Sequence, residues 1–222
     1  MFNSLCLLLC TVAFTQAYSN SKPVSPVPVT IYYESLCPYS VRFIVDRLVP
    51  IYNDKEFNFA GLLANMDLVP YGHVYNPDFS NYKYTCQHGV PECEGNKLHG
   101  CAVKYIKDKS ILLNYISCLM NTTQYTMSPI LSYPANECKN LVPSSRMQHI
   151  FNCYNSNEGW DLFNQHGMTT EKFFGPNRFL VPYVSFHEKK NDELSATAKG
   201  NFKKALCVQN GVRHHACSDY KV

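Results

Sequence analysis

One cysteine stands where a strand-like run passes into a helix-like run. The residues VTIYYE end at Glu34, CPYS follows at 37–40, and VRFIVDRLVP continues the chain. With Cys37 as the N-cap and Pro38 as the first helical residue, the sulfur faces the unpaired backbone N–H groups of the helix. These donors and the helix dipole favour the thiolate, which is the nucleophilic form of cysteine, so we expect a lowered pKa for Cys37.

Ser40 lies three residues after Cys37, where its backbone N–H and its hydroxyl could both donate to the sulfur. This arrangement indicates a reactive single thiol. The alternative is that Cys37 is half of a structural disulfide, and that Pro38 and Ser40 are ordinary residues of a helix start. The cysteine count favours the reactive thiol. Eleven cysteines include Cys6 and Cys10 in the expected signal, and the remaining odd number leaves at least one free or paired between chains in an oxidising compartment.

The first residues have the pattern of a signal peptide. An apolar stretch from Leu5 to Phe14 precedes Thr15-Gln16-Ala17, which fits a cleavage site, so we expect a signal at 1–17. A short membrane anchor is the alternative, although the run is too short to span a bilayer comfortably. No later segment is apolar enough to cross a membrane after signal removal. Together with the expected signal, this predicts a product of the secretory pathway. Asn121 begins a glycosylation sequon.

The elements that position Cys37 follow from apolar spacing. Residues 18–28 form a Pro-rich, extended leader, and Val29–Glu34 reads as a buried strand. A helix is expected from about Cys37 towards Pro50, and a second strand at 57–66, which together make a βαβ unit. The apolar positions of that helix recur every three or four residues, at Val41, Ile44, Val45, Leu48 and Val49.

The rest of the chain is a loop-rich, cysteine-bearing middle followed by a second strand and helix region. A proline stands at the start of the strand VPYVSFH. In thioredoxin-like folds a cis-proline at such a place packs opposite the active cysteine, and Pro182 could take that part. A proline of an edge strand is the alternative, and the residue alone favours it. The further elements expected are helices at 105–120, 144–167 and 194–209, a strand at 181–187, and a helix stop at Asn210-Gly211.

Residues 86–101 read CQHGVPECEGNKLHGC. This segment resembles the signature of the gamma-interferon-inducible lysosomal thiol reductase (GILT) family: CQHG, two residues, EC, two residues, N, four residues, C. Every fixed position matches. LVPYG at 68–72 and VPYVSF at 181–186 are also similar to that family, and the resemblance covers roughly 29–217.

The resemblance implies an α/β protein, with a thioredoxin-like domain at 29–217 and a helical, disulfide-rich insertion at about 67–175. It also implies a secreted or lysosomal protein that reduces protein disulfides with a pair of cysteines spaced CxxC. Carried over by position, Cys37 is the attacking cysteine and Pro182 is the cis-proline. The second cysteine of the family falls on Ser40, which is a departure from the pattern.

The missing sulfur matters because a CxxC site resolves its own mixed disulfide, whereas a serine hydroxyl cannot form a disulfide. The first hypothesis is a reductase that works through Cys37 and needs an external thiol, such as glutathione or cysteine, to release each protein substrate. The second is a secreted protein that binds a protein partner and has lost, or nearly lost, reduction because of Ser40.

The other cysteines are expected to form four disulfides. The spacing of these cysteines does not determine how they pair. We expect Cys207–Cys217 and Cys118–Cys153 as two of the pairs. The eight are Cys86, Cys93, Cys101, Cys118, Cys138, Cys153, Cys207 and Cys217.

Metal and nucleic acid are not expected. CQHGVPEC and HHAC lack the short CxxC or HxxxH spacing of structural zinc sites, so we expect neither a metal nor a cofactor. His88 and His99 are expected to be structural hydrogen-bonding residues. The net charge of +3, without a basic block, makes nucleic acid a poor partner.

Overall fold

The computed structural model describes residues 26–124, 132–175, 179–209 and 214–220. The expected signal peptide, most of the leader and the expected helix stop at 210–211 lie outside these ranges. Val27 is buried, and its backbone N–H donates to the carbonyl of Leu62 over 2.8 Å. The last residues of the leader therefore pack with the domain.

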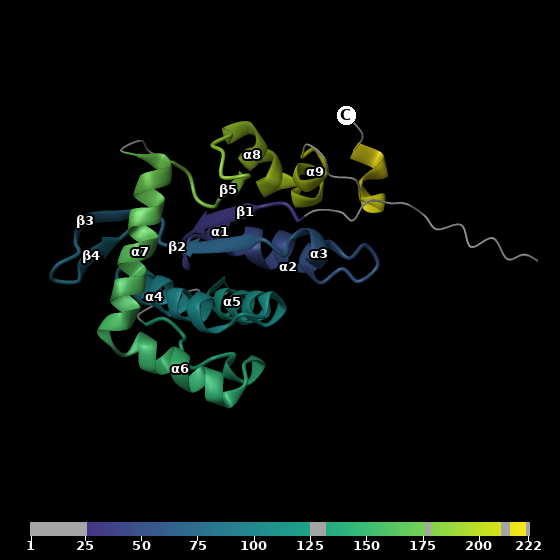
Figure 1. Ribbon diagram of the computed structural model, residues 1–222. Helices are drawn as coiled ribbons and strands as arrows, with labels where there is room; N and C mark the ends of the chain where they lie inside the picture. The colour runs from purple at the N-terminus through teal and green to yellow at the C-terminus, as the bar shows by residue number, and fades with distance from the viewer. Residues whose placement is uncertain (1–25, 125–131, 176–178, 210–213, 221–222) are drawn as a thin grey trace, which may run out of the picture.

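A three-stranded sheet lies at the centre of the fold (Figure 1). β1 (Val29–Tyr33) is the middle strand, parallel to β2 (Met66–Pro70) and antiparallel to β5 (Tyr183–Phe186). The β-branched and aromatic residues of these strands suit a sheet that is covered on both faces. The strands expected near 29–34 and 181–187 are confirmed.

The helix after Cys37 is one continuous run of three segments. α1 (Pro38–Phe43) passes into a π-helical stretch (Ile44–Leu48) and then into α2 (Val49–Tyr52). The expected helix from Cys37 towards Pro50 is confirmed, and the π-helical stretch is a feature that the apolar spacing did not indicate.

The strand expected at 57–66 is wrong. Residues Phe59–Leu62 form a short helix, α3, and β2 begins only after it. Phe59, Leu62 and Leu63 recur at the three- and four-residue spacing of one helix face, and all three are buried. A continuous apolar run does not distinguish a helix from a strand, and here the helical spacing decides.

Between β2 and β5 the described chain forms a hairpin and a set of long helices. The helical sequence expected at 144–167 is confirmed by two of them. The helix expected at 105–120 is shifted, because Tyr105 ends one helix and the next begins at Lys109. The elements are β3 (Val74–Asp78), β4 (Lys83–Cys86), α4 (Val90–Tyr105), α5 (Lys109–Gln124), a 3-10 turn (Lys139–Leu141), α6 (Ser144–Tyr154) and α7 (Asn157–Phe174).

The C-terminal part contains α8 (Asp192–Gly200), α9 (Phe202–Cys207) and a 3-10 turn (His215–Tyr220). The single helix expected at 194–209 is therefore interrupted. Asn201 marks the break, since its side chain accepts a hydrogen bond from the backbone N–H of Lys204 and caps α9.

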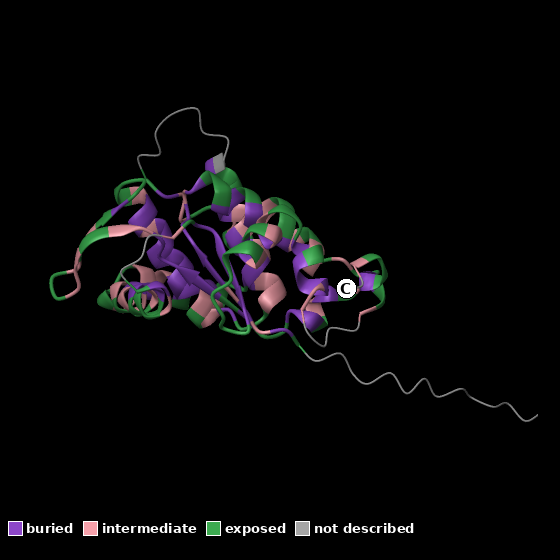
Figure 2. Ribbon diagram, turned by 90° about the horizontal axis from the view of Figure 1, so that it is seen from above, coloured by how far each residue is buried: buried purple, intermediate pink, exposed green. Residues whose placement is uncertain are grey.

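The two faces of the sheet are covered by different elements. Val29, Ile31 and Tyr33 point into the main core, which they share with the helices that follow β1. On the other face a smaller aromatic cluster gathers around Tyr32 and Phe174. Figure 2 shows the strands of this three-stranded sheet as the buried centre of the molecule, with exposed residues on the outer sides of the helices.

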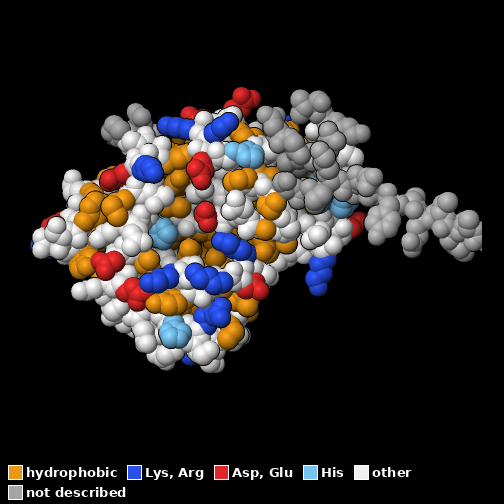
Figure 3. Space-filling model, in the orientation of Figure 1, with side chains coloured by type: hydrophobic (Ala, Val, Ile, Leu, Met, Phe, Trp, Pro, Cys, Tyr) orange, Lys and Arg blue, Asp and Glu red, His pale blue; other side chains and the backbone are white. Residues whose placement is uncertain are grey.

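The mixed α/β class and the thioredoxin-like arrangement are confirmed in these features. A parallel β1–helix–β2 unit is followed by a helical segment with disulfides and by an antiparallel strand. On the face shown in Figure 3, acidic and basic side chains are interspersed. None of the helices in the described ranges is long and apolar enough to cross a membrane.

Candidate functional site

The turn between β1 and α1 carries the Cys37 thiol. Cys37 is the N-cap of α1, with extended backbone angles (φ −65°, ψ 120°), and Pro38 occupies the first turn, as expected. Among the cysteines that the structure describes, Cys37 is the one outside a disulfide. The alternative of a structural disulfide at Cys37 is therefore wrong.

The sulfur of Cys37 faces the segment before β5. Its thiol lies 3.9 Å from the backbone carbonyl oxygen of Val181 and is oriented to donate to it. The Val181–Pro182 peptide bond is cis. Cys37 and Pro182, which are 145 positions apart in the sequence, therefore lie on facing segments. Cys37 is buried, with an exposed fraction of 6%.

The electrostatic environment of Cys37 differs from the expected one. Burial raises the pKa of the thiol, and the nearby Glu34 carboxyl raises it too, whereas hydrogen bonds from Ser40 and from the Tyr39 N–H lower it. The donors of the first helical turn are present, but their effect is smaller than the desolvation of the thiolate. The expected lowering of the Cys37 pKa is therefore wrong in its net direction.

Ser40 is fully buried and has a second contact besides the sulfur. Its hydroxyl oxygen accepts a hydrogen bond from the backbone N–H of Glu34, 3.3 Å away. Ser40 therefore ties the end of β1 to the first turn of α1. It occupies the position of a second sulfur without being able to form a disulfide.

Helix α4 holds the turn between β1 and α1 in place through the side chain of Asn96. The side-chain carbonyl of Asn96 accepts a hydrogen bond from the N–H of Ser35 (2.8 Å), and its amide donates to the carbonyl of Tyr71 (3.0 Å). All three groups are buried. One asparagine thus connects the loop before Cys37 with the end of β2.

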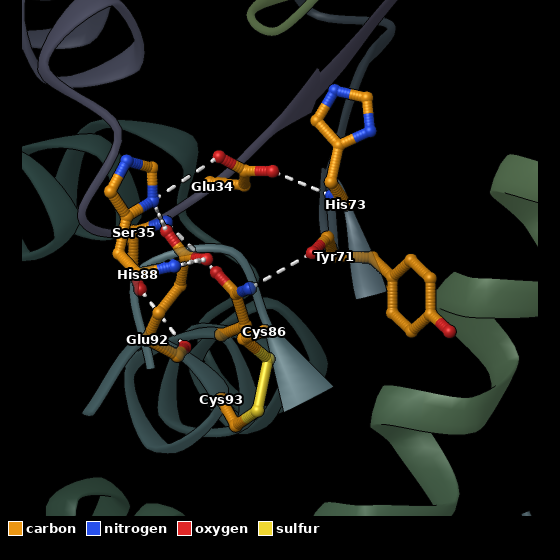
Figure 4. Close-up of a disulfide and its surroundings, with 9 residues drawn as sticks. Glu34, Ser35, Tyr71, His73, Cys86, His88, Glu92 and Cys93 are labelled. Atoms are coloured by element: carbon orange, nitrogen blue, oxygen red, sulfur yellow. Dashed lines mark hydrogen bonds and ion pairs between the residues drawn. A yellow bond between two sulfur atoms is a disulfide. The ribbon is translucent and has the colours of Figure 1, made fainter. Parts of the chain in front are cut away.

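Two more contacts fix α4 against the same loop. The Ser35 hydroxyl donates to the backbone carbonyl of Glu92 over 3.2 Å. At Gly95 an added Cβ would lie 2.4 Å from the Ser35 hydroxyl oxygen, so the close approach of helix and loop requires glycine there. The Cys86–Cys93 disulfide joins the end of β4 to the first turn of α4 (Figure 4).

The four disulfides use the eight cysteines that were expected to be paired. Cys207–Cys217 is confirmed. The expected Cys118–Cys153 pair is wrong, because the bonds run instead between Cys118 and Cys138 and between Cys101 and Cys153. Cys101 lies on α4, so that disulfide joins α4 to α6.

His99 has the structural role expected of it. Its two ring nitrogens contact the hydroxyls of Tyr33 (3.1 Å) and Tyr133 (2.7 Å), and all three side chains are buried. Burial lowers the pKa of His99 to about 3, so the ring stays neutral. His88 also forms hydrogen bonds, through its backbone N–H and Nδ1 to Glu92.

Glu34 is a residue of the site that the sequence reasoning did not single out. Its side chain is fully buried at the end of β1. Burial and the neighbouring Glu92 raise the pKa of this carboxyl to about 8, against the lowering effects of the His73 N–H and of His88. A charged residue ending an otherwise buried strand was the signal that could have found it.

Asn121 is exposed on α5, whereas Thr123, the third residue of its sequon, is buried. Its glycosylation stays a prediction.

Comparisons with known proteins identify the same family that the segment 86–101 resembles. Residues 28–142 match the sequence model of the family described as gamma interferon inducible lysosomal thiol reductase (GILT). A gamma-interferon-inducible lysosomal thiol reductase-like protein of Anopheles gambiae is 36% identical, covering 96% of this chain and 87% of the relative. The gamma-interferon-inducible lysosomal thiol reductase of Carassius auratus is 30% identical, over 87% and 72%. Among solved structures, DsbA of Chlamydia trachomatis gives a TM-score of 0.48 at 14% identity, over 76% of this chain and 80% of that one.

Proposed function

Because the chain belongs to the gamma-interferon-inducible lysosomal thiol reductase family, we propose that it is a thiol–disulfide oxidoreductase whose attacking group is the Cys37 sulfur. One observation carries this proposal. Among the described cysteines Cys37 alone is unpaired, and it lies at a helix start beside the cis Val181–Pro182 bond. The roles are Cys37 as nucleophile, Ser40 as hydrogen-bond donor to its sulfur, and Pro182 as the residue that shapes the facing segment.

The first step is attack of the Cys37 thiolate on a protein disulfide. One sulfur of the substrate becomes bonded to Cys37, and the other leaves as a thiolate that takes up a proton. The Ser40 and Tyr39 donors stabilise negative charge on the Cys37 sulfur, and the same donors stabilise it when Cys37 later leaves.

The second step needs an external thiol, because Ser40 carries no sulfur. A first molecule of glutathione or cysteine attacks the mixed disulfide at Cys37 and releases the substrate thiol. A second molecule attacks the resulting Cys37 adduct, which frees Cys37 and yields the oxidised small thiol. The substrate gains two electrons and two protons, and two small thiols supply them.

The surface around Cys37 suits a disulfide within an apolar, accessible segment of protein. Tyr39 is 71% exposed next to the thiol, and Leu180, next to Val181, is 74% exposed. Burying apolar substrate side chains against them would hold the disulfide close to the Cys37 sulfur. The substrate class is therefore protein disulfides rather than small disulfides alone.

The compartment proposed is the secretory pathway, with secretion or a lysosomal destination. Four disulfides in the described chain fit an oxidising environment. The proposed signal at 1–17 and a glycan on Asn121 belong to the same proposal.

A second candidate function is a secreted binding protein with little or no reductase activity. The observations that favour it are the low exposure of Cys37 and the raised pKa of its thiol. Both reduce the fraction of reactive thiolate that a substrate can reach. Ser40 favours it as well, since the intramolecular release step is absent.

The test is reduction of several protein disulfides by the wild-type protein and by Cys37→Ser, each with glutathione and with cysteine. We expect turnover that depends on the small thiol in the wild type and only the uncatalysed rate in Cys37→Ser, because no other described cysteine is free. Equal rates for the two proteins across all substrates and thiols would leave the binding function as the better account.

A further inference from the structure

Three side chains of metal-ligand type meet beside the disulfide in Figure 4. Glu34 lies at the end of β1, His88 in the loop after β4, and Glu92 in the first turn of α4. One ligand atom from each lies within 4.8 Å of the other two. His88 and Glu92 are four residues apart in the sequence, and the fold adds Glu34 from a distant segment.

The Glu34 carboxyl is built into its place. One oxygen, Oε1, accepts a hydrogen bond from the backbone N–H of His73. Gly72, with φ +67°, packs directly on the side chain, and a Cβ there would lie 1.9 Å from the Glu34 Cγ. Only glycine leaves room for the carboxyl in this position.

The other oxygen of Glu34 has no hydrogen-bond partner among the described residues. This atom, Oε2, is buried and lies 3.6 Å from Nδ1 of His88. The Nδ1 atom also contacts Oε2 of Glu92 over 2.5 Å, and the side chains of both glutamates are 0% exposed. Buried carboxylates require a compensating positive group, and here an unsatisfied oxygen points at the only imidazole of the cluster.

We propose that this cluster binds a divalent cation of the Zn²⁺ class through Nδ1 of His88, Oε2 of Glu92 and Oε2 of Glu34. One imidazole and two carboxylates form a donor set that zinc accepts. Zinc bonds of about 2.0–2.2 Å place tetrahedral donors roughly 3.3 Å apart. The 3.6 Å separation of His88 and Glu34 is close to this value, whereas the 2.5 Å separation of His88 and Glu92 must widen.

The cation would replace the proton that His88 and Glu92 share. His88 can move to admit it, since 31% of its side chain is exposed while both glutamates are buried. The ion would link the end of β1 to the start of α4, two elements that the Ser35–Asn96 hydrogen bond already joins. The proposal does not depend on the function of Cys37. The rival account, in which a proton alone neutralises the cluster, predicts no metal binding.

The experiment uses chelator-treated full-length Cys37→Ser protein, so that the free thiol cannot act as a ligand. Zn²⁺ is titrated by calorimetry, and the melting temperature is followed with and without it. We expect one Zn²⁺ per chain, and a rise in Tm on the order of 5 °C when free Zn²⁺ is about 100-fold above Kd. Co²⁺ should give weak visible bands without the intense thiolate charge-transfer band.

His88→Gln and Glu34→Gln, each in the same background, should weaken Zn²⁺ binding by at least about 10-fold. Glu94→Gln is the matched control on the same helix, because the Glu94 carboxylate pairs with Lys97 at 2.8 Å, and it should bind as the parent does. His88 is partly exposed, so its variant keeps the test valid even if Glu34→Gln does not fold. The proposal is overturned if the parent does not bind Zn²⁺ at millimolar concentration, or if His88→Gln binds it equally well.

Discussion

The turn at Cys37 and the segment 86–101 use cysteine in opposite ways. In the turn, the sulfur is unpaired and faces the carbonyl of Val181. In the segment, both Cys86 and Cys93 close a disulfide, and Asn96 satisfies two buried backbone groups of other segments. The first region leaves its sulfur outside any disulfide, whereas the two cysteines and Asn96 of the second are held in structural contacts.

This difference teaches that the most family-specific residues are not the reacting ones. The 86–101 signature builds the support on which the Cys37 turn rests, through Ser35. The short CPYS motif holds the proposed nucleophile, and its fourth residue here is serine. Replacing the second sulfur by Ser40 therefore leaves the support intact, because the serine hydroxyl makes its own hydrogen bond to Glu34.

Ser40→Cys should produce the largest change within the turn. A second sulfur would resolve the mixed disulfide within the molecule, and its effective concentration exceeds that of millimolar glutathione. We expect the steady-state rate of protein disulfide reduction to rise on the order of 10-fold.

The matched control for this prediction is Ser40→Ala, which loses the hydroxyl hydrogen bond without gaining a sulfur. Its rate should not exceed that of the wild type. If Ser40→Cys is no faster than Ser40→Ala at low glutathione, then release of the substrate from the Cys37 mixed disulfide does not limit the rate of reduction.

Asn96→Ala tests the supporting region. It leaves the N–H of Ser35 and the carbonyl of Tyr71 buried without a partner. We expect the free energy of unfolding, from urea denaturation, to fall by about 3 kcal/mol. Asn152→Ala, which removes an exposed side-chain contact on α6, should change it by less than about 0.5 kcal/mol. Equal effects of the two substitutions would mean that Asn96 does not support the turn.

The support and the turn also share Glu34, whose protonation should be visible in stability. Its folded pKa of about 8 lies above the usual carboxyl value of 4.5, so the folded state binds the proton more tightly. The stabilisation is complete below about pH 4.5 and is lost as the pH rises through 8. We therefore compare the free energy of unfolding of the wild type with that of Glu34→Gln, both in chelator. The wild-type value minus the variant value should fall by on the order of 2 kcal/mol across this pH window. A difference that is constant with pH would contradict the raised pKa.

The sequence predicted the elements whose apolar spacing is regular. The strand at Val29–Glu34 and the helix after Cys37 followed from local pattern. Helix α4 did not, since the stretch 86–101 was expected to be loop-rich. Its buried polar residues, Glu92, Asn96, Lys97 and His99, interrupt the apolar periodicity that marks a helix.

The site was predictable where chemistry is local and not where it depends on distant segments. The odd count predicted one leftover cysteine, and the helix-start position selected Cys37, whereas the isomer of Pro182 needed the structure. The pKa of Cys37 was expected with the wrong sign, because helix-start donors are visible in sequence and burial is not. The Cys101–Cys153 pair and the meeting of Glu34 with His88 depend on how α4 packs.

The most direct test of the account is the fate of the Cys37 mixed disulfide. Wild-type protein is mixed with a disulfide-bonded protein substrate without small thiol, quenched with acid and measured by intact mass. We expect one substrate chain attached at Cys37 in the quenched sample, and reduced substrate only after glutathione is added. The absence of any adduct at Cys37, or the release of reduced substrate without an external thiol, would contradict a single-sulfur mechanism.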